Sequence, residues 1–300
     1  MSCRSSAADN HDTLAIQIEL HGKPMTGENL GNQMYRIVSD AKANLFEQGE
    51  LAQLTYGAFD IAARAMDDSD QEEIRVTFPV GWRADNQPIQ STRTYKKDQL
   101  RGRYQFLAFQ QLSINGLVQL VTIMEAMFGD VVRAVVMKYP KKIGAKRTVP
   151  LQTVLEAGSI TEVQLRAADT FLNELAYKSP SEFAESLQAL MAVNLLECPA
   201  FHRYIEMKAS RDIFIHNRGV ASDIYVRKAG THLRVQAGMN LPADIHYFMQ
   251  SYEACLQVTE WLESELHQHW HSSHYEERQS KQLQIPMSEA EERSEDGPNV

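Results

Sequence analysis

The stretch LVQLVTIMEAMFGDVVRAVVM, residues 117–137, decides the fold class of this chain. Three charged residues and a glutamine interrupt it, so it is expected not to span a membrane: Gln119, Glu125, Asp130 and Arg133. Apolar residues recur there at three- and four-residue steps and trace one wide face: Phe109, Leu112, Leu117, Val121, Met124, Phe128, Val132 and Val135. We therefore predict a long, buried core helix, which the Tyr139-Pro140 pair ends.

Further helix signals follow this segment. Thr161 with Gln164 resembles a capping box, and Ser179, Pro180 and Glu182 supply a cap, a first-turn proline and a matching acid. Three later positions are typical of helix ends: Pro199 and Pro242 near starts, and Gly219 as a left-handed cap. About five substantial helices are expected after residue 104. The fold class is thus mainly α, with a helical bundle over residues 104–271.

The sequence before residue 104 has a mixed character. Apolar residues alternate with polar ones over Leu14–Leu20 and over Ile74–Val80, as in half-buried strands that could pair. Helical runs are expected between them, from Leu30 to Leu45 and from Leu51 to Met66. We predict a small N-terminal α+β unit of unknown role over residues 1–103. Residues 272–300 are polar and acidic, which favours a disordered tail.

Composition limits the possible function classes. The formal net charge of −9 over 300 residues argues against nonspecific coating of nucleic acid. Cys3, Cys198 and Cys255 lie far apart, which argues against disulfides and against a thiolate zinc site. The polar first residues do not resemble a secretory signal, so we expect a cytoplasmic protein. No cofactor is expected, because the sequence lacks a phosphate-cradling glycine-rich loop.

The segment Arg211-Asp-Ile-Phe-Ile-His216 is the best candidate for a chemical site. Five residues on a helix separate Arg211 and His216 by about 140° and about 7.5 Å, so both side chains could reach one groove. Asp212 and His216 are helix neighbours, and the carboxylate could orient the imidazole. Histidine can transfer protons near neutral pH, and arginine can grip a phosphate. Alternatively, Arg211 only pairs with Glu206 or Asp212, and the cations only stabilise the helix end.

The stretch Ala209–Val220, ASRDIFIHNRGV, resembles the signature of HEPN domains, in which Arg, a polar residue and mainly apolar residues precede His. The resemblance covers about residues 104–270 and implies an all-α bundle. It implies a metal-independent ribonuclease site in which Arg211 and His216 of two protomers meet, with Asp212 at the variable polar position. The expected product is a 2′,3′-cyclic phosphate end. Such an activity suggests a toxin or phage-defence effector.

Other residues are candidates for RNA contact rather than for catalysis. They lie beside the motif and on a basic segment: Asn217, Arg218, Lys141, Lys142, Lys146 and Arg147. His267 and His271 have the spacing of a chelating pair, but without a closing ligand in the sequence we predict no metal site. The partners expected are RNA, a second copy of the chain and a regulatory protein, with no membrane. The alternative function is a noncatalytic HEPN-like dimerisation or partner-binding module.

Overall fold

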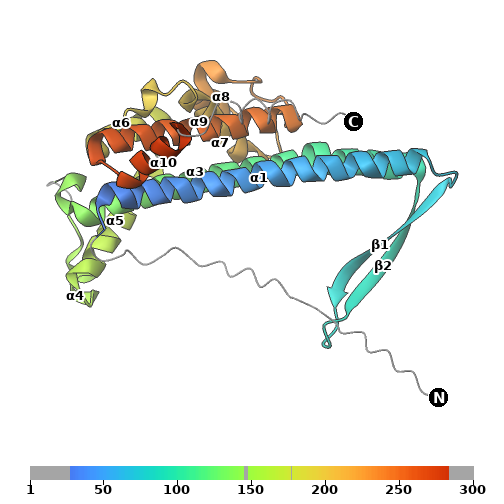
Figure 1. Ribbon diagram of the computed structural model, residues 1–300, viewed down its shortest axis with the longest axis horizontal. Helices are drawn as coiled ribbons and strands as arrows, with labels where there is room; N and C mark the ends of the chain where they lie inside the picture. The colour runs from blue at the N-terminus through green and yellow to red at the C-terminus, as the bar shows by residue number, and fades with distance from the viewer. Residues whose placement is uncertain (1–27, 145–147, 177, 284–300) are drawn as a thin grey trace.

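A computed structural model of the protein describes residues 28–144, 148–176 and 178–283. These residues are mainly helical and contain one two-stranded antiparallel sheet, which confirms that the fold is mainly α (Figure 1). None of the described helices is long and apolar enough to cross a bilayer. The strand expected over residues 14–20, together with Lys146 and Arg147, lies outside the described residues.

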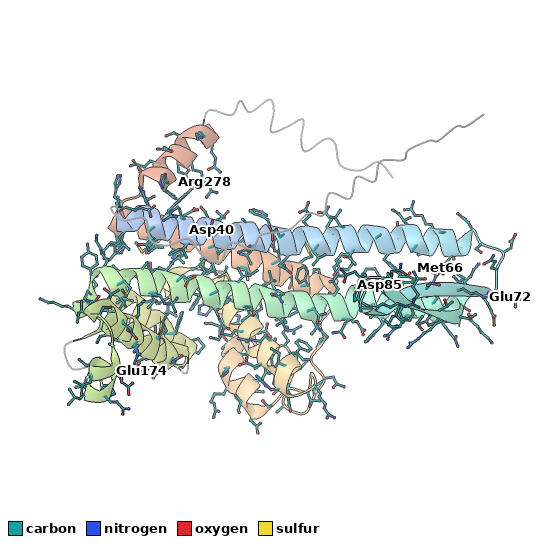
Figure 2. The ribbon with its side chains drawn as sticks, turned by 90° about the horizontal axis from the view of Figure 1, so that it is seen from below. Asp40, Met66, Glu72, Asp85, Glu174 and Arg278 are labelled. Carbon is teal, nitrogen blue, oxygen red and sulfur yellow. The ribbon has the colours of Figure 1, made fainter. Side chains whose placement is uncertain are left out.

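Helix α3, Leu112–Lys138, is the centre of the bundle, as predicted. Its buried positions extend from Ser113 to Val136 and cover most of its circumference. Helices α1, Leu30–Asp67, and α9, Ile245–Trp270, pack along it and share one continuous apolar core with it. This long three-helix layer is visible in Figure 2. Burial of large aliphatic side chains along all three helices is the main source of stability.

Glycines allow two close helix contacts in this layer. A Cβ on Gly116 of α3 would lie 2.5 Å from the Phe248 ring of α9, which is itself buried. A Cβ on Gly49 of α1 would lie 2.8 Å from Tyr252. The absence of a side chain therefore lets α9 approach both of its long neighbours.

Helix α1 is continuous, whereas the sequence suggested two helical runs. Gly49 does not interrupt it, because that glycine is buried against Tyr252 and no proline is present to break the hydrogen-bond ladder. The first half of α1 belongs to the same apolar core as α3 and α9. The expected boundary between residues 103 and 104 falls inside continuous helical structure from Lys97 to Lys138.

A β-hairpin extends from the far end of α1 (Figure 1). Strand β1, Glu73–Trp82, confirms the strand predicted around residues 74–80. Its partner is β2, Pro88–Lys96, a strand that was not expected from the sequence. The β2 segment is polar on both faces and largely exposed, so it lacks the alternation that marks a half-buried strand.

Helix α2, Lys97–Gln105, returns the chain to α3 through a π-helical turn, Phe106–Gln111. The remaining elements form the outer part of the bundle (Figure 1). They are the 3₁₀ turn Pro140–Ile143, α4 Leu151–Glu156, α5 Ile160–Ala176, α6 Pro180–Met191, the 3₁₀ turn Leu195–Glu197, α7 Phe201–His216, α8 Asp223–Ala229 and the 3₁₀ turn Gly230–His232. The Ser179–Glu182 capping box of α6 is present as predicted. The start of α5 differs, because Ser159 rather than Thr161 accepts the hydrogen bond from the backbone N–H of Glu162.

The chain after residue 272 is not a tail throughout, since Ser273–Leu283 form helix α10. Its Arg278 donates two hydrogen bonds, of 2.9 and 2.8 Å, to the buried carboxylate of Glu263 on α9. The same carboxylate receives Lys42 of α1 at 3.2 Å. This carboxylate therefore joins three helices, a tertiary effect that the polar composition of the segment concealed. Residues 284–300 lie outside the described residues.

The two glycines of α3 give a matched test of this packing. Gly116→Ala should lower the free energy of unfolding by about 1–3 kcal/mol, because the buried Phe248 ring cannot move aside freely. A Cβ on Gly129 would meet nothing within 4 Å, so Gly129→Ala should raise the free energy of unfolding by about 0.4–1 kcal/mol. Urea unfolding followed by circular dichroism measures both. Equal effects of the two substitutions would contradict the close α3–α9 contact.

Candidate functional site

The Arg211–His216 motif occupies the last turns of α7, as predicted. The helix ends at Asn217, where the N–H groups of Asn217 and Gly219 both donate to the carbonyl of Ile213, at 2.9 and 3.2 Å. Gly219 has a φ of 82°, which confirms the predicted left-handed cap, and Arg218 before it has a φ of 53°. This cap fixes the direction in which the chain leaves the motif.

The Arg211 guanidinium lies between two carboxylates. Its Nη2 donates to Glu125 Oε2 of α3 at 2.8 Å, and its Nε lies 3.3 Å from Asp212 Oδ1. Nε is buried and makes no hydrogen bond of good geometry, although the Asp212 oxygen is near. Arg211 is only 17% exposed, so these neighbours hold the side chain in place. The expected partner Asp212 is present, whereas Glu206 is not among the contacts of Arg211.

Two lysines extend this pair into a row of alternating charges. Lys208 lies 3.0 Å from Glu125 Oε1, and Lys228 of α8 donates to Asp212 Oδ2 at 3.0 Å. The row therefore reads Lys208, Glu125, Arg211, Asp212 and Lys228, with one more positive than negative charge. Each carboxylate is shared by two cations, so an anion could bind beside the row without expelling a carboxylate from it.

His216 is exposed on the final turn of α7. The predicted orienting hydrogen bond from Asp212 is not among the interactions of the described residues, because Asp212 pairs with Arg211 and Lys228 instead. The imidazole is open to solvent and to any molecule that covers this end of the helix. In a single copy, therefore, Arg211 is largely enclosed by its neighbours, whereas His216 is exposed to solvent.

A pocket of about 360 Å³ lies between α6, α7 and α8, next to the motif. Its floor is apolar and aromatic, with Phe183, Phe201, Tyr204 and Ile205. Four cations line it, and none of its lining residues is acidic: Lys178, Lys208, Arg227 and Lys228. Such a pocket suits an anion with a flat apolar body. No local sequence pattern predicts this pocket, since its walls come from segments distant in the chain.

The pocket and Arg211 lie on the same side of α7. Phe201, Tyr204 and Lys208 follow the three- and four-residue steps of a helix face, and the same steps continue to Arg211 and Ile215. Lys208 and Arg211 are separated by a rise of about 4.5 Å. A ligand in the pocket would therefore extend naturally toward the Arg211 guanidinium.

A buried carboxylate on the other side of α7 fixes the helix in the fold. Glu206 accepts hydrogen bonds from Ser210 at 2.6 Å, Tyr225 at 2.9 Å and Tyr247 at 2.7 Å. Arg234 completes the set at 3.1 Å, and its guanidinium lies over the Tyr247 ring. Four donors offset the cost of burying the charge and connect α7 to α8, α9 and the 230–242 loop.

The basic segment near residue 141 is not close to the motif along the bundle. Lys142 donates to the Leu190 carbonyl at 2.9 Å and lies over the Trp270 ring, at the end of α9. That place is beyond Lys138, about 20 Å along α3 from Glu125. Lys141 is exposed in the same turn, and Asn217 caps α7 by donating to the Val220 carbonyl. Of the predicted RNA contacts, Asn217 and Arg218 lie next to the motif.

Side chains near the end of α9 approach the geometry of a metal site. One potential ligand atom from each of His267, His271 and Glu276 lies within 4.8 Å of the others. However, His267 Nδ1 accepts a hydrogen bond from the Ser272 N–H at 3.1 Å, which leaves the proton of the neutral ring on Nε2. His267 thus has no free lone pair to offer in this arrangement. These three side chains are better explained as the polar end of a helix than as ligands of a metal ion.

Comparison with protein-family models, with curated protein sequences and with solved structures finds no match to this chain. The motif, the charge row and the pocket are therefore the features from which a function can be inferred.

The Glu206 cluster predicts a loss of stability at high pH. Burial, and then the Glu206 carboxylate, raise the pKa of Tyr247 well above its ordinary value. Below about pH 10 the tyrosine is neutral in both states, and above it only the unfolded chain ionises. The free energy of unfolding should therefore fall by about 1.4 kcal/mol per pH unit for this residue.

Tyr247→Phe removes this contribution, so its stability should decline less steeply than that of the wild type above about pH 10. Urea unfolding at a series of pH values measures both slopes, with pH 7 as the reference for the lost hydrogen bond. Parallel curves for the two proteins would contradict an un-ionised, buried Tyr247.

Proposed function

We propose that the protein is a metal-independent endoribonuclease of HEPN type. The observation that carries the proposal is that the α7 face lining a cationic, acid-free pocket continues to Arg211, with exposed His216 on the last turn of the same helix. RNA supplies the matching chemistry: a flat base for the aromatic floor and phosphates for the cations. The resemblance of residues 209–220 to the HEPN signature points to the same activity.

The reaction requires proton transfer and charge stabilisation but no metal. His216 removes the proton from the RNA 2′-hydroxyl, whose oxygen then forms a bond to the adjacent phosphorus. The bond from phosphorus to the 5′-oxygen breaks, and an imidazole of the second copy protonates that oxygen. The products are a 2′,3′-cyclic phosphate and a 5′-hydroxyl end. Arg211 stabilises the negative charge on the phosphate oxygens during transfer.

Arg211 has donors left for this role. Glu125 and Asp212 approach Nη2 and Nε, which leaves the Nη1 protons for a phosphate oxygen. The carboxylates also hold the guanidinium in one position, which reduces the ordering cost when RNA binds. Two copies that bring their α7 ends together would place two histidines and two arginines around one phosphate.

Cleavage by the purified protein tests the proposal. With EDTA present, His216→Ala and Arg211→Ala should each lower the rate of RNA cleavage by about 100-fold or more, because each removes one catalytic group. His202→Ala and Arg203→Ala are matched controls, since both residues are exposed on the same helix outside the motif. They should retain wild-type rates. The proposal fails if His216→Ala, still folded by circular dichroism, cleaves as fast as the wild type.

A second candidate function is a noncatalytic dimerisation or partner-binding module. The two carboxylates on Arg211 favour it, because they already satisfy much of the charge that would hold a phosphate. In that case the row of charges has only a structural role, in which its ion pairs hold α7 against α3 and α8. RNA binding would then be insensitive to the charge at position 125.

Glu125→Gln distinguishes the two functions. The amide can still accept a hydrogen bond from Arg211, but the negative charge beside an incoming phosphate is gone. For the ribonuclease we expect RNA to bind about three- to tenfold more tightly. Asp40→Asn, an exposed position on α1 (Figure 2), is the matched control and should change little. Fluorescence anisotropy with 2′-O-methyl RNA, which cannot be cleaved, measures both. Unchanged affinity with Glu125→Gln would favour the noncatalytic module.

A further inference from the structure

The second half of α1 exposes an apolar stripe. Leu51, Leu54 and Ile61 are 51%, 67% and 71% exposed, and Ala58 and Ala65 are exposed between and beyond them. The opposite face of the same segment is packed: Tyr56 stacks on Phe109 at 5.3 Å, and Phe59 meets that ring edge-on at 5.0 Å. The helix is therefore apolar on two faces, only one of which the described part of the chain covers.

The stripe has the spacing of a helix-pairing seam. Its positions, residues 51, 54, 58, 61 and 65, alternate in steps of three and four, which keeps them on one narrow line. The line extends for about 21 Å. A narrow seam of this kind fits one partner helix better than a broad protein surface or a small ligand.

We propose that a second copy of this chain covers the stripe, with the two α1 helices antiparallel. In that arrangement Leu51 faces the partner's Ile61, and Leu54 faces the partner's Ala58. The two-fold axis repeats both contacts, so the stripe residues of the two copies form four successive layers of paired side chains. A large residue meets a small one in the two central layers, which lets the helices approach closely.

The charges beside the stripe agree with this direction. Glu50 and Arg64 lie on the same edge of the seam, seven residues on either side of Gly57. In an antiparallel pair Glu50 lies near the partner's Arg64, and the axis makes this contact twice. In a parallel pair the like charges would lie at equal heights. Arg64 pairs with Asp60 within the chain, but that pair is exposed and weak enough to share the guanidinium.

Gly57 is the second independent sign of a close partner. A glycine inside a helix costs about 0.5–1 kcal/mol relative to alanine. A Cβ there would meet nothing within 4 Å, so no contact among the described residues requires a glycine. The residue lies between Glu50 and Arg64 on the edge of the seam, beside the two central layers of the proposed interface. A missing side chain there permits the close approach that the alanine layers need.

This interface goes beyond the proposed ribonuclease function. Figure 2 shows α1 on one side of α3 and the pale orange α7–α8 region on the other. The α1 stripe therefore cannot bring two copies of Arg211 and His216 together. If both surfaces pair, each copy has two different neighbours, and the assembly is larger than a dimer.

Sedimentation equilibrium of the full chain tests the proposal. We expect self-association that Leu54→Glu weakens by about 100-fold or more in dissociation constant, because a charge would be buried in the seam. Gln53→Glu introduces the same charge at the neighbouring, exposed position of α1 and should change the dissociation constant by less than about threefold. His216→Ala serves as a second control, since it alters the other surface.

Charge reversal tests the antiparallel direction. Glu50→Arg and Arg64→Glu should each raise the dissociation constant by about tenfold, since each places like charges together twice. The double variant should recover the wild-type value. A wild-type chain that stays monomeric, or equal effects of Leu54→Glu and Gln53→Glu, would overturn the proposal. Failure of the double variant to recover would overturn the antiparallel arrangement, and none of these results depends on RNA cleavage.

Discussion

Burial of α3 on nearly every side is the constraint on which the rest of the structure depends. Thirteen of its residues are buried, so helices must lie on most of its faces. Helices α1 and α9 cover one part, and α5, α6 and α7 cover the other. Few positions remain for charge, and two of them form ion pairs with neighbouring helices: Arg133 with Asp169 at 3.0 Å, and Glu125 with Arg211 at 2.8 Å. The core helix thus determines where the motif arginine is held.

The candidate site combines fixed and open parts. On one side of α7 the buried Glu206 cluster fixes the helix against α8 and α9. On the other side the charge row and the pocket remain accessible, and His216 is fully in reach of solvent. Rigid support beneath an exposed polar face is what precise binding of a charged substrate requires. The buried cluster therefore serves the site without touching it.

Much of the fold could be predicted from local signals. The core helix, the capping box at Ser179 and Glu182, and the end of α7 at Gly219 follow from apolar spacing and from backbone hydrogen bonding within a few residues. Strand β2 could not be predicted this way, because no apolar face distinguishes it. Helix α10 was hidden because a buried ion pair, rather than an apolar stripe, fastens it.

The site was only partly predictable for the same reason. Asp212 beside Arg211 is a local neighbour, and that contact was expected. Glu125 precedes Arg211 by 86 residues, and nothing in either segment identifies the other as its partner. Glu206 on the same helix was an expected alternative partner, but Arg234 of the following loop reaches it instead. Competition among several nearby cations is decided by tertiary packing, which a single sequence does not display.

The π-helical turn Phe106–Gln111 has a consequence for the projecting hairpin. Its wider turn accommodates an extra residue between α2 and α3, as shown by the Leu112 N–H bonding to the Leu107 carbonyl. The extra residue therefore changes the rotational position of α2 about the helix axis relative to α3. Deleting one residue there would rotate α2 by about 100° relative to α3. Because α2 follows β2 directly, the helical register of this turn helps to set the direction in which the hairpin projects, together with the Arg101–Asp67 ion pair that joins α2 to the end of α1.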